Sequence, residues 1–197
     1  MILALLLALS ACAPKAPVPT GAVEAPAPRR ALDPAVQAAL EAGAADLDVG
    51  VRRRALGTLV AADPAPAGGA WALRARFDPS EYVRRAAVDA LADRLDEAET
   101  RALLRALVDD ENGDPWSRGA AALVLADGIV DGRVPAGEHA EDRARITAAA
   151  AGARGSRAAA LLLAATRTGD AAARTRLEEL LSGGDLPLEL WFLRAVG

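Results

Sequence analysis

The feature that most constrains this chain is an internal repeat. The segment DLDVGVRRRALGTL at residues 46–59 returns 32 residues later as DPSEYVRRAAVDAL at residues 78–91. In both copies an Asp precedes a Val by five residues and an Arg by six, and a closing leucine follows. A weaker copy lies 34 residues further on, with Asn112 at the Asp position and Arg118 at the Arg position. A period of roughly 20–50 residues is typical of repeat architectures, in which each unit buries its apolar face against its neighbours.

The apolar positions inside each copy predict helices. Their spacing of four, one and three residues marks one face of an amphipathic helix. The abundance of alanine, leucine and arginine, with only 3% aromatic residues, also favours helix over strand. Asp33, Asp78 and Asp114 each precede a proline, a pattern typical of a helix start, because Asp caps the first turn and proline tolerates it. The apolar positions are Val51, Ala55, Leu56 and Leu59 in the first copy and Val83, Ala87, Val88 and Leu91 in the second.

The repeat resembles the HEAT repeats, specifically the short bacterial kind named after phycobilisome lyases. The resemblance rests on the Asp, the Val-Arg pair and the following Ala-aliphatic positions, and it is closest over residues 46–95. It implies an all-α fold, a right-handed α-solenoid whose units are pairs of antiparallel helices. Loop-forming segments between the apolar runs divide the chain into about five pairs, at residues 33–62, 64–95, 96–126, 138–168 and 170–197.

In this family, Arg–Asp contacts between successive units form a ladder along the stack. The resemblance therefore predicts a structural ladder made of Asp46, Arg52, Asp78 and Arg84. The last segment, LPLELWFLRAVG at residues 186–197, has two interpretations: it packs inward on the fourth pair, or it offers an apolar end to a partner.

The N-terminus resembles a bacterial lipoprotein leader. The apolar run at residues 2–9 is shorter than the roughly 20 residues that a membrane-spanning helix needs, but it has the length of a signal-peptide core. The following LSAC resembles a lipobox, which implies cleavage after residue 11 and acylation of Cys12, the only cysteine. A buried first helix with a buried thiol is the alternative. No Lys or Arg precedes the apolar run, although signal peptides begin with a basic segment. An upstream start codon would supply one.

Residues 12–32 follow as a Pro/Ala-rich linker, and residues 33–197 form the predicted repeat domain. The linker has no apolar periodicity and is expected to be extended, as polyproline II. Its first residue after the cysteine, Ala13, is not the Asp that retains lipoproteins of enteric bacteria in the inner membrane. The resemblance therefore implies a lipid-anchored protein of the cell envelope, in the outer membrane and facing the periplasm.

Candidate chemistry is sparse. Asp127, Asp131 and Glu138 stand at positions one, five and twelve of a degenerate EF-hand-like calcium loop, which has Ile129 at position three and Pro135 at position nine. The alternative is a Gly-rich connection between helix pairs. The only histidine, His139, lies among acidic residues at a predicted helix start and has no nucleophile motif to serve.

These observations predict a non-catalytic scaffold for protein–protein interaction, with an unidentified envelope protein as partner and the membrane reached through the lipid. A formal net charge of −4 argues against a nucleic-acid partner. No cofactor and no small-molecule substrate are expected. Two alternatives are an enzyme or enzyme accessory of the lyase-like kind and a weakly calcium-responsive scaffold.

Overall fold

A computed structural model describes residues 31–154 and 158–182, and the regular secondary structure in this part of the chain is helical, without strands. The all-α prediction is confirmed. The leader at residues 1–11, Cys12, most of the linker and the segment after Ser182 lie outside the described residues. The helices are α2 (Pro34–Gly43), α3 (Val49–Ala62), α4 (Gly69–Arg76), α5 (Glu81–Ala90), α6 (Ala98–Asp109), α7 (Pro115–Val130), α8 (His139–Gly152), α9 (Ala159–Arg167) and α10 (Ala171–Ser182), with 3-10 turns η1 (Pro66–Gly68), η2 (Leu91–Arg94) and η3 (Ala136–Glu138).

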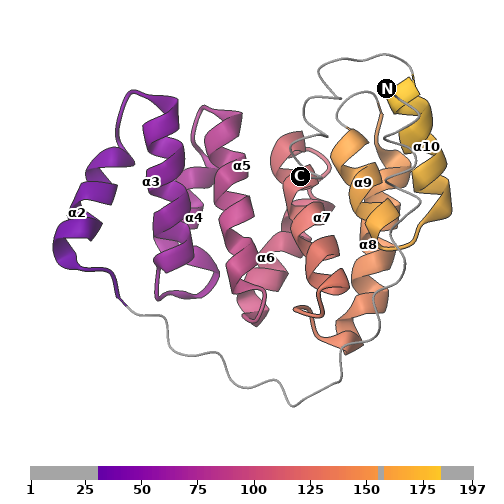
Figure 1. Ribbon diagram of the computed structural model, residues 1–197, viewed down its shortest axis with the longest axis horizontal. Coiled ribbons are helices and arrows are strands. Elements are labelled where there is room, and N and C mark those ends of the chain that lie inside the picture. The colour runs from indigo at the N-terminus through magenta and orange to yellow at the C-terminus, as the bar shows by residue number, and fades with distance from the viewer. Residues whose placement is uncertain (1–30, 155–157, 183–197) are drawn as a thin grey trace.

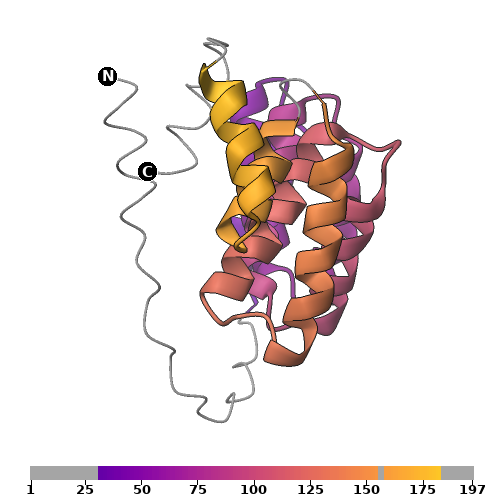
Figure 2. The ribbon, with the colours of Figure 1, turned by 90° about the vertical axis from the view of Figure 1, so that its right-hand side faces the viewer.

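The helices form two layers that run from α2 at one end of the molecule to α10 at the other (Figures 1 and 2). In one layer α3 packs against α5, α5 against α7, and α7 against α9. The helices α2, α4, α6, α8 and α10 lie against this row, each in contact with the helix that follows or precedes it in the chain. Each second helix of a pair therefore touches the second helix of the next pair.

Two of the three predicted Asp caps lie at helix starts. Asp33 accepts a hydrogen bond from the Ala35 amide at 2.8 Å, and Asp114 accepts one from the Ser117 amide at 3.0 Å. Asp78 is not the cap of α5, because Ser80 holds that position. The Asp78 carboxylate lies instead between the Ser80 amide and Arg52, so the prediction of a cap at this position is wrong.

The connection predicted between the third and fourth pairs, at residues 127–137, begins too early, because α7 continues to Val130. Gly128, within that span, is a packing residue. A Cβ at this position would lie 2.5 Å from Leu95 Cδ1, so the glycine permits α7 to pass close to the end of η2. Glycine occupies this position because Leu95 leaves no room for a side chain, and not because the chain turns here.

One fully buried arginine joins the second pair to the connection before it. The Arg94 side chain is 0% exposed and donates hydrogen bonds to the carbonyl oxygens of Val60 at 2.8 Å, of Asp63 at 2.7 Å, and of Ala65. Its Nε lies 3.0 Å from both carboxylate oxygens of Glu97. Burial raises the pKa of Glu97, but hydrogen bonds from Arg94, Thr100 and the Ala67 amide outweigh it and bring the pKa to about 2.

We expect Arg94→Met to destabilise the fold by about 3 kcal/mol or more, because it leaves buried carbonyls and the Glu97 carboxylate without their donor. Urea unfolding followed by circular dichroism measures the effect. The matched control is Arg143→Met, at an exposed arginine on α8, which we expect to change the free energy of unfolding by no more than about 0.5 kcal/mol. Equal effects of the two substitutions would contradict this account of Arg94.

Candidate interaction groove and its supporting ion pairs

The structure brings Arg52 of α3 against Asp78 of the next pair. Arg52 Nε lies 2.9 Å from Asp78 Oδ2, and Nη2 lies 3.3 Å from Oδ1. Its Nη1 donates to the carbonyl oxygens of Asp46 and Leu47, each at 2.9 Å. The Asp46 carboxylate is not the acceptor of Arg52 in the ladder, since it accepts a hydrogen bond from the Asp48 amide within its own turn. Asp46 therefore contributes its backbone and Asp78 its carboxylate.

Arg84 of α5 repeats this arrangement one unit further along. Its Nη1 donates to the carbonyl oxygens of Asp78 at 2.7 Å and Pro79 at 3.1 Å, and Nη2 lies 3.1 Å from Asp114 Oδ1. The acceptor is Asp114, not the Asn112 that the repeat spacing placed at the Asp position. Burial raises the pKa of Asp114, but hydrogen bonds from Arg84 and Ser117 outweigh it, and the pKa is lowered.

The arginines share one helix position. Arg52, Arg84 and Arg101 each stand four residues after their helix N-cap, at Asp48, Ser80 and Glu97 respectively. From this position Nη1 folds back onto the two carbonyls that precede the cap. Arg101 was not anticipated from the sequence, although Nη1 reaches Leu95 O at 2.9 Å and Asp96 O at 3.1 Å in the same manner. Its N-cap is Glu97, which is not one of the Asp positions of the repeat, so the repeat spacing gave no signal for it.

The three candidate calcium ligands do not converge. Glu138 is held by Arg101, with Nε 2.8 Å from Oε2 and Nη2 2.9 Å from Oε1, and also contacts Arg105. Asp127 lies inside α7 and pairs with Arg167, and Asp131 pairs with Arg133. No group of three potential metal ligands exists within residues 31–154 and 158–182. The EF-hand-like interpretation is therefore wrong, and Glu138 is an ion-pair partner between α6 and η3.

His139, at the start of α8, contacts the backbone of the connection that precedes it. Its Nε2 lies 2.8 Å from the carbonyl oxygen of Val134, at the start of α8. Nearby, Asp142 is 0% exposed and binds Arg105, with Asp142 Oδ1 2.7 Å from Arg105 Nε. Asp142 thus serves the contact between α6 and α8, while Glu141 pairs with Arg145 of its own helix.

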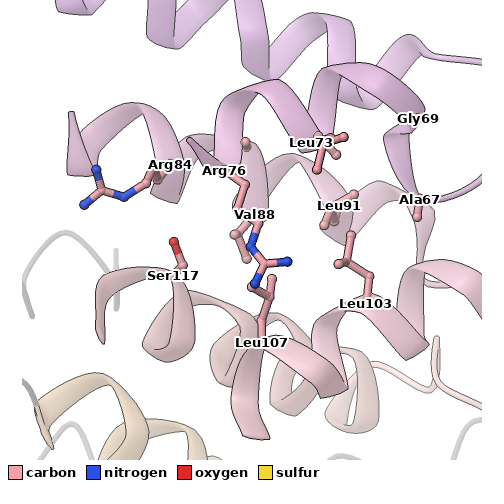
Figure 3. Close-up of a pocket in the computed structure, with 12 residues that line it drawn as sticks. Ala67, Gly69, Leu73, Arg76, Arg84, Val88, Leu91, Leu103, Leu107 and Ser117 are labelled. Atoms are coloured by element: carbon pink, nitrogen blue, oxygen red, sulfur yellow. The ribbon is translucent and has the colours of Figure 1, made fainter. Parts of the chain in front are cut away.

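An apolar hollow lies between α4 and α6, and we call it the α4–α6 groove. α4 makes little contact with α6, which packs against η1 instead. The cavity has a volume of about 210 Å³, and Figure 3 shows Leu73, Leu91, Leu103 and Leu107 pointing into the same space. The groove is formed by Ala72, Leu73 and Arg76 of α4, Ala87 and Val88 of α5, Leu91 of η2, and Leu103 and Leu107 of α6, with Ala67, Gly69, Arg84 and Ser117 at its ends.

A strained turn keeps α4 short and the groove open. Ala67, Gly68 and Gly69 all have positive φ, at 54°, 74° and 52°. A Cβ at Gly69 would lie 2.7 Å from Asp63 Oδ2, so only glycine fits there. The Ala67 amide donates to Glu97 Oε2 at 2.9 Å, which fixes this turn to the start of α6. The layer formed by α2, α4, α6, α8 and α10 is therefore interrupted between α4 and α6.

The groove is flanked by exposed apolar side chains. Leu73 is 59% exposed and Phe77 is 75% exposed, and their four-residue spacing puts them on the same side of α4. Phe77 lines a second cavity of about 220 Å³, which shares Arg76, Leu107 and Ser117 with the first. Arg76 Nη2 crosses toward α6 and lies 3.6 Å from Asp110 Oδ2. The groove thus has an apolar interior, apolar flanks and one exposed ion pair across its end.

Comparison with known proteins yields no match among protein-family models, curated proteins or solved structures. Among the described helices, none combines the length and the hydropathy needed to cross a membrane.

Glu138→Gln is expected to remove part of the pH dependence of stability. The hydrogen bond from Arg101 lowers the pKa of Glu138 to about 2, with Arg105 adding to it against the opposing effect of burial. A group whose folded pKa lies below its unfolded value of 4.5 stabilises the fold above that pH and loses its contribution as the pH falls toward 2.

The difference in unfolding free energy between the wild type and Glu138→Gln should therefore be largest at neutral pH and shrink as the pH falls from about 5 to 2. Urea titrations across this pH range measure it. Glu99→Gln, at an exposed carboxylate on the same helix as Arg101, is the control and should show no such trend. A pH-independent difference for Glu138→Gln would contradict its role in the ion pair.

Proposed function

We propose that this chain is a lipid-anchored envelope protein whose HEAT-like, right-handed α-solenoid acts as a non-catalytic scaffold and binds a partner protein in the α4–α6 groove. The observation that carries the proposal is the groove itself, an apolar hollow flanked by Leu73 and Phe77 on a stack whose charged groups bind each other. Exposed apolar surface beside a preformed cavity is typical of an interaction site.

The arrangement of the helices supports the solenoid. Successive second helices pack in one row, and Arg52 and Arg84 make the same contacts one unit apart. A device repeated at each unit boundary is what a stack of equivalent helix pairs needs to fix the register of one pair on the next.

The size of the groove favours a protein partner over a small-molecule substrate. Pockets for small molecules typically enclose about 300–1,000 Å³, and the cavity beside Leu73 encloses about 210 Å³. That volume suits the insertion of single apolar side chains. A lyase-like accessory role would need a larger site, and the groove is lined mainly by aliphatic side chains, with Arg76, Arg84 and Ser117 as its polar residues (Figure 3).

The ion pairs support a scaffold without a reaction of its own. His139 lies against a backbone carbonyl, and the carboxylates of Glu138 and Asp142 are occupied by Arg101 and Arg105. Groups held in this way stabilise contacts between helices and are not poised to exchange protons with a substrate. The support for the anchor is the LSAC sequence ending at Cys12 and the Pro-rich linker behind it.

Leu73→Asp is expected to weaken partner binding by at least about tenfold, because a buried charge replaces a central apolar contact of the kind that dominates interfaces. Crosslinking of intact envelopes, followed by purification of the tagged protein and quantitative mass spectrometry, measures partner recovery. The matched control is Val130→Asp, at a residue that is 62% exposed at the end of α7 and away from the groove. Equal recovery with both variants would exclude the groove as the binding site.

Cys12→Ser is expected to release the protein from the membrane, because the serine hydroxyl does not replace the thiol in acylation. Fractionation of cells that express the tagged wild type and the variant measures this. The wild type should partition with membranes and enter the detergent phase of Triton X-114. Retention of Cys12→Ser in that phase would contradict lipid anchoring while leaving the groove proposal intact.

A further inference from the structure

The charged residues that line the α4–α6 groove all carry the same sign. Its cavity is lined by two charged side chains, those of Arg76 and Arg84, and no carboxylate of the described residues contributes to the lining. Figure 3 shows Arg84 and Ser117 at one end of the groove and Ala67 and Gly69 at the other. An acidic group therefore matches this lining better than a basic one does.

Arg76 is only loosely held by its own ion pair. Its Nη2 lies 3.6 Å from Asp110 Oδ2, and the two side chains are 46% and 38% exposed. This separation exceeds the roughly 2.7–2.9 Å of a charge-assisted hydrogen bond, and exposed pairs of this kind contribute little to stability. Arg76 also shares the wall of the cavity with Val88 and Leu107 (Figure 3). A carboxylate from outside can therefore replace Asp110 beside the aliphatic side chains at little cost.

Arg84 leaves a surplus of hydrogen-bond donors at the same groove. Its Nη1 donates to the carbonyl oxygens of Asp78 and Pro79 and its Nη2 to Asp114, but its Nε is buried and has no hydrogen-bond partner in the described structure. Both Asp114 oxygens are already engaged, one by Arg84 and the other by the amide and hydroxyl of Ser117. A ligand that brings acceptor oxygens therefore suits this end of the groove better than one that brings further donors.

Apolar hollows meet at Arg76. The cavity of about 210 Å³ is lined by Leu73 and Leu103, and the cavity of about 220 Å³ by Phe77. Arg76 and Leu107 line both cavities. A segment that places an apolar side chain in each hollow must therefore pass the Arg76 guanidinium between them.

We propose that the occupant of the α4–α6 groove is an acidic, amphipathic segment of the partner protein, which inserts one or two apolar side chains and pairs an Asp or Glu carboxylate with Arg76. This inference rests on the groove being the binding site, as proposed above, and adds the sign of the partner's charge. Arg76 then determines specificity, because it attracts a carboxylate and repels a lysine or arginine at the same place.

Selection of a phage-displayed library of random peptides on the full-length tagged protein tests this proposal. Peptides that need the groove are those that lose binding to Leu73→Gln, a neutral change that does not itself repel acidic peptides. We expect these peptides to be enriched in Asp or Glu beside Leu, Ile or Phe. Fluorescence anisotropy of the enriched peptides, synthesised with a fluorophore, then measures their Kd for the wild type and for the variants.

Arg76→Glu and Asp110→Asn distinguish recognition from a structural role of the ion pair. Arg76→Glu should weaken peptide binding by at least about tenfold, and Arg76→Met, which keeps the aliphatic stem, by less. Asp110→Asn should tighten binding about twofold or more, because it removes the carboxylate that competes for Arg76. A pair that only stabilised the fold would make both substitutions act in the same direction, since each of them breaks it. Arg133→Glu, at an exposed arginine paired with Asp131, is the matched control and should leave the Kd unchanged.

Groove-dependent peptides that are basic or uncharged, or that bind Arg76→Glu as tightly as the wild type, would overturn the proposal and leave the groove as a binding site. If no enriched peptide depends on Leu73, the groove is not the binding site and both proposals fail. Sedimentation velocity tests the remaining occupant, a second copy of the chain. Self-association of the wild type that Leu73→Gln abolishes would assign the groove to that copy and overturn the proposal of a partner segment.

Discussion

The stack depends on an arginine placed four residues after a helix cap. From there one guanidinium nitrogen binds the two carbonyls that precede the cap, while the other nitrogens bind a carboxylate of the next unit, as Arg52 does with Asp78. A single side chain thus joins the entry of its own helix to the turn of its neighbour. Lysine lacks the planar set of donors that allows both contacts at once. The register of one pair on the next is therefore set by directional contacts as well as by the shape of the core.

Such contacts matter more in a core built from small side chains. Between α7 and α9, a Cβ added at Gly119 would lie 2.6 Å from Ala160 Cβ, so these helices approach closely through glycine and alanine. Close approach of two helices gains dispersion contacts but buries little area per residue. Helix surfaces made of glycine and alanine also slide past each other more easily than surfaces with interlocked large side chains. At the second pair, Arg94 supplies directional contacts of this kind by donating hydrogen bonds to three carbonyl oxygens within residues 60–65. Partly buried ion pairs add specificity where leucine and phenylalanine would otherwise supply it.

The sequence predicted the parts of this structure that are set within one helix. The spacing of Ala55, Leu56 and Leu59 determines which face is buried, and the Val-Arg pair placed Arg52 and Arg84 at the unit boundaries. Features that depend on a distant neighbour were missed or misread. The acceptor of Arg84 depends on the length of the α6–α7 connection, which brings Asp114 rather than Asn112 within hydrogen-bond distance of the guanidinium. The groove depends on a left-handed turn at Ala67 that is tied to Glu97, thirty residues away. Gly128 resembled a helix breaker because the approach of Leu95 is not visible in the sequence around it.

The same ion pairs also fix the two sides of the α4–α6 groove. Arg84 links α5 to the cap of α7 through Asp114, and Glu97 links the turn before α4 to the start of α6. Both sides of the groove are thus held by contacts that a partner does not need to break. Only the exposed pair between Arg76 and Asp110, at 3.6 Å, spans the opening. A site whose sides are already fixed loses little conformational entropy on binding. An apolar side chain that enters between Leu73 and Leu103 would therefore find a preformed hollow, and Arg76, whose side chain is 46% exposed, could exchange Asp110 for an acidic group of the partner.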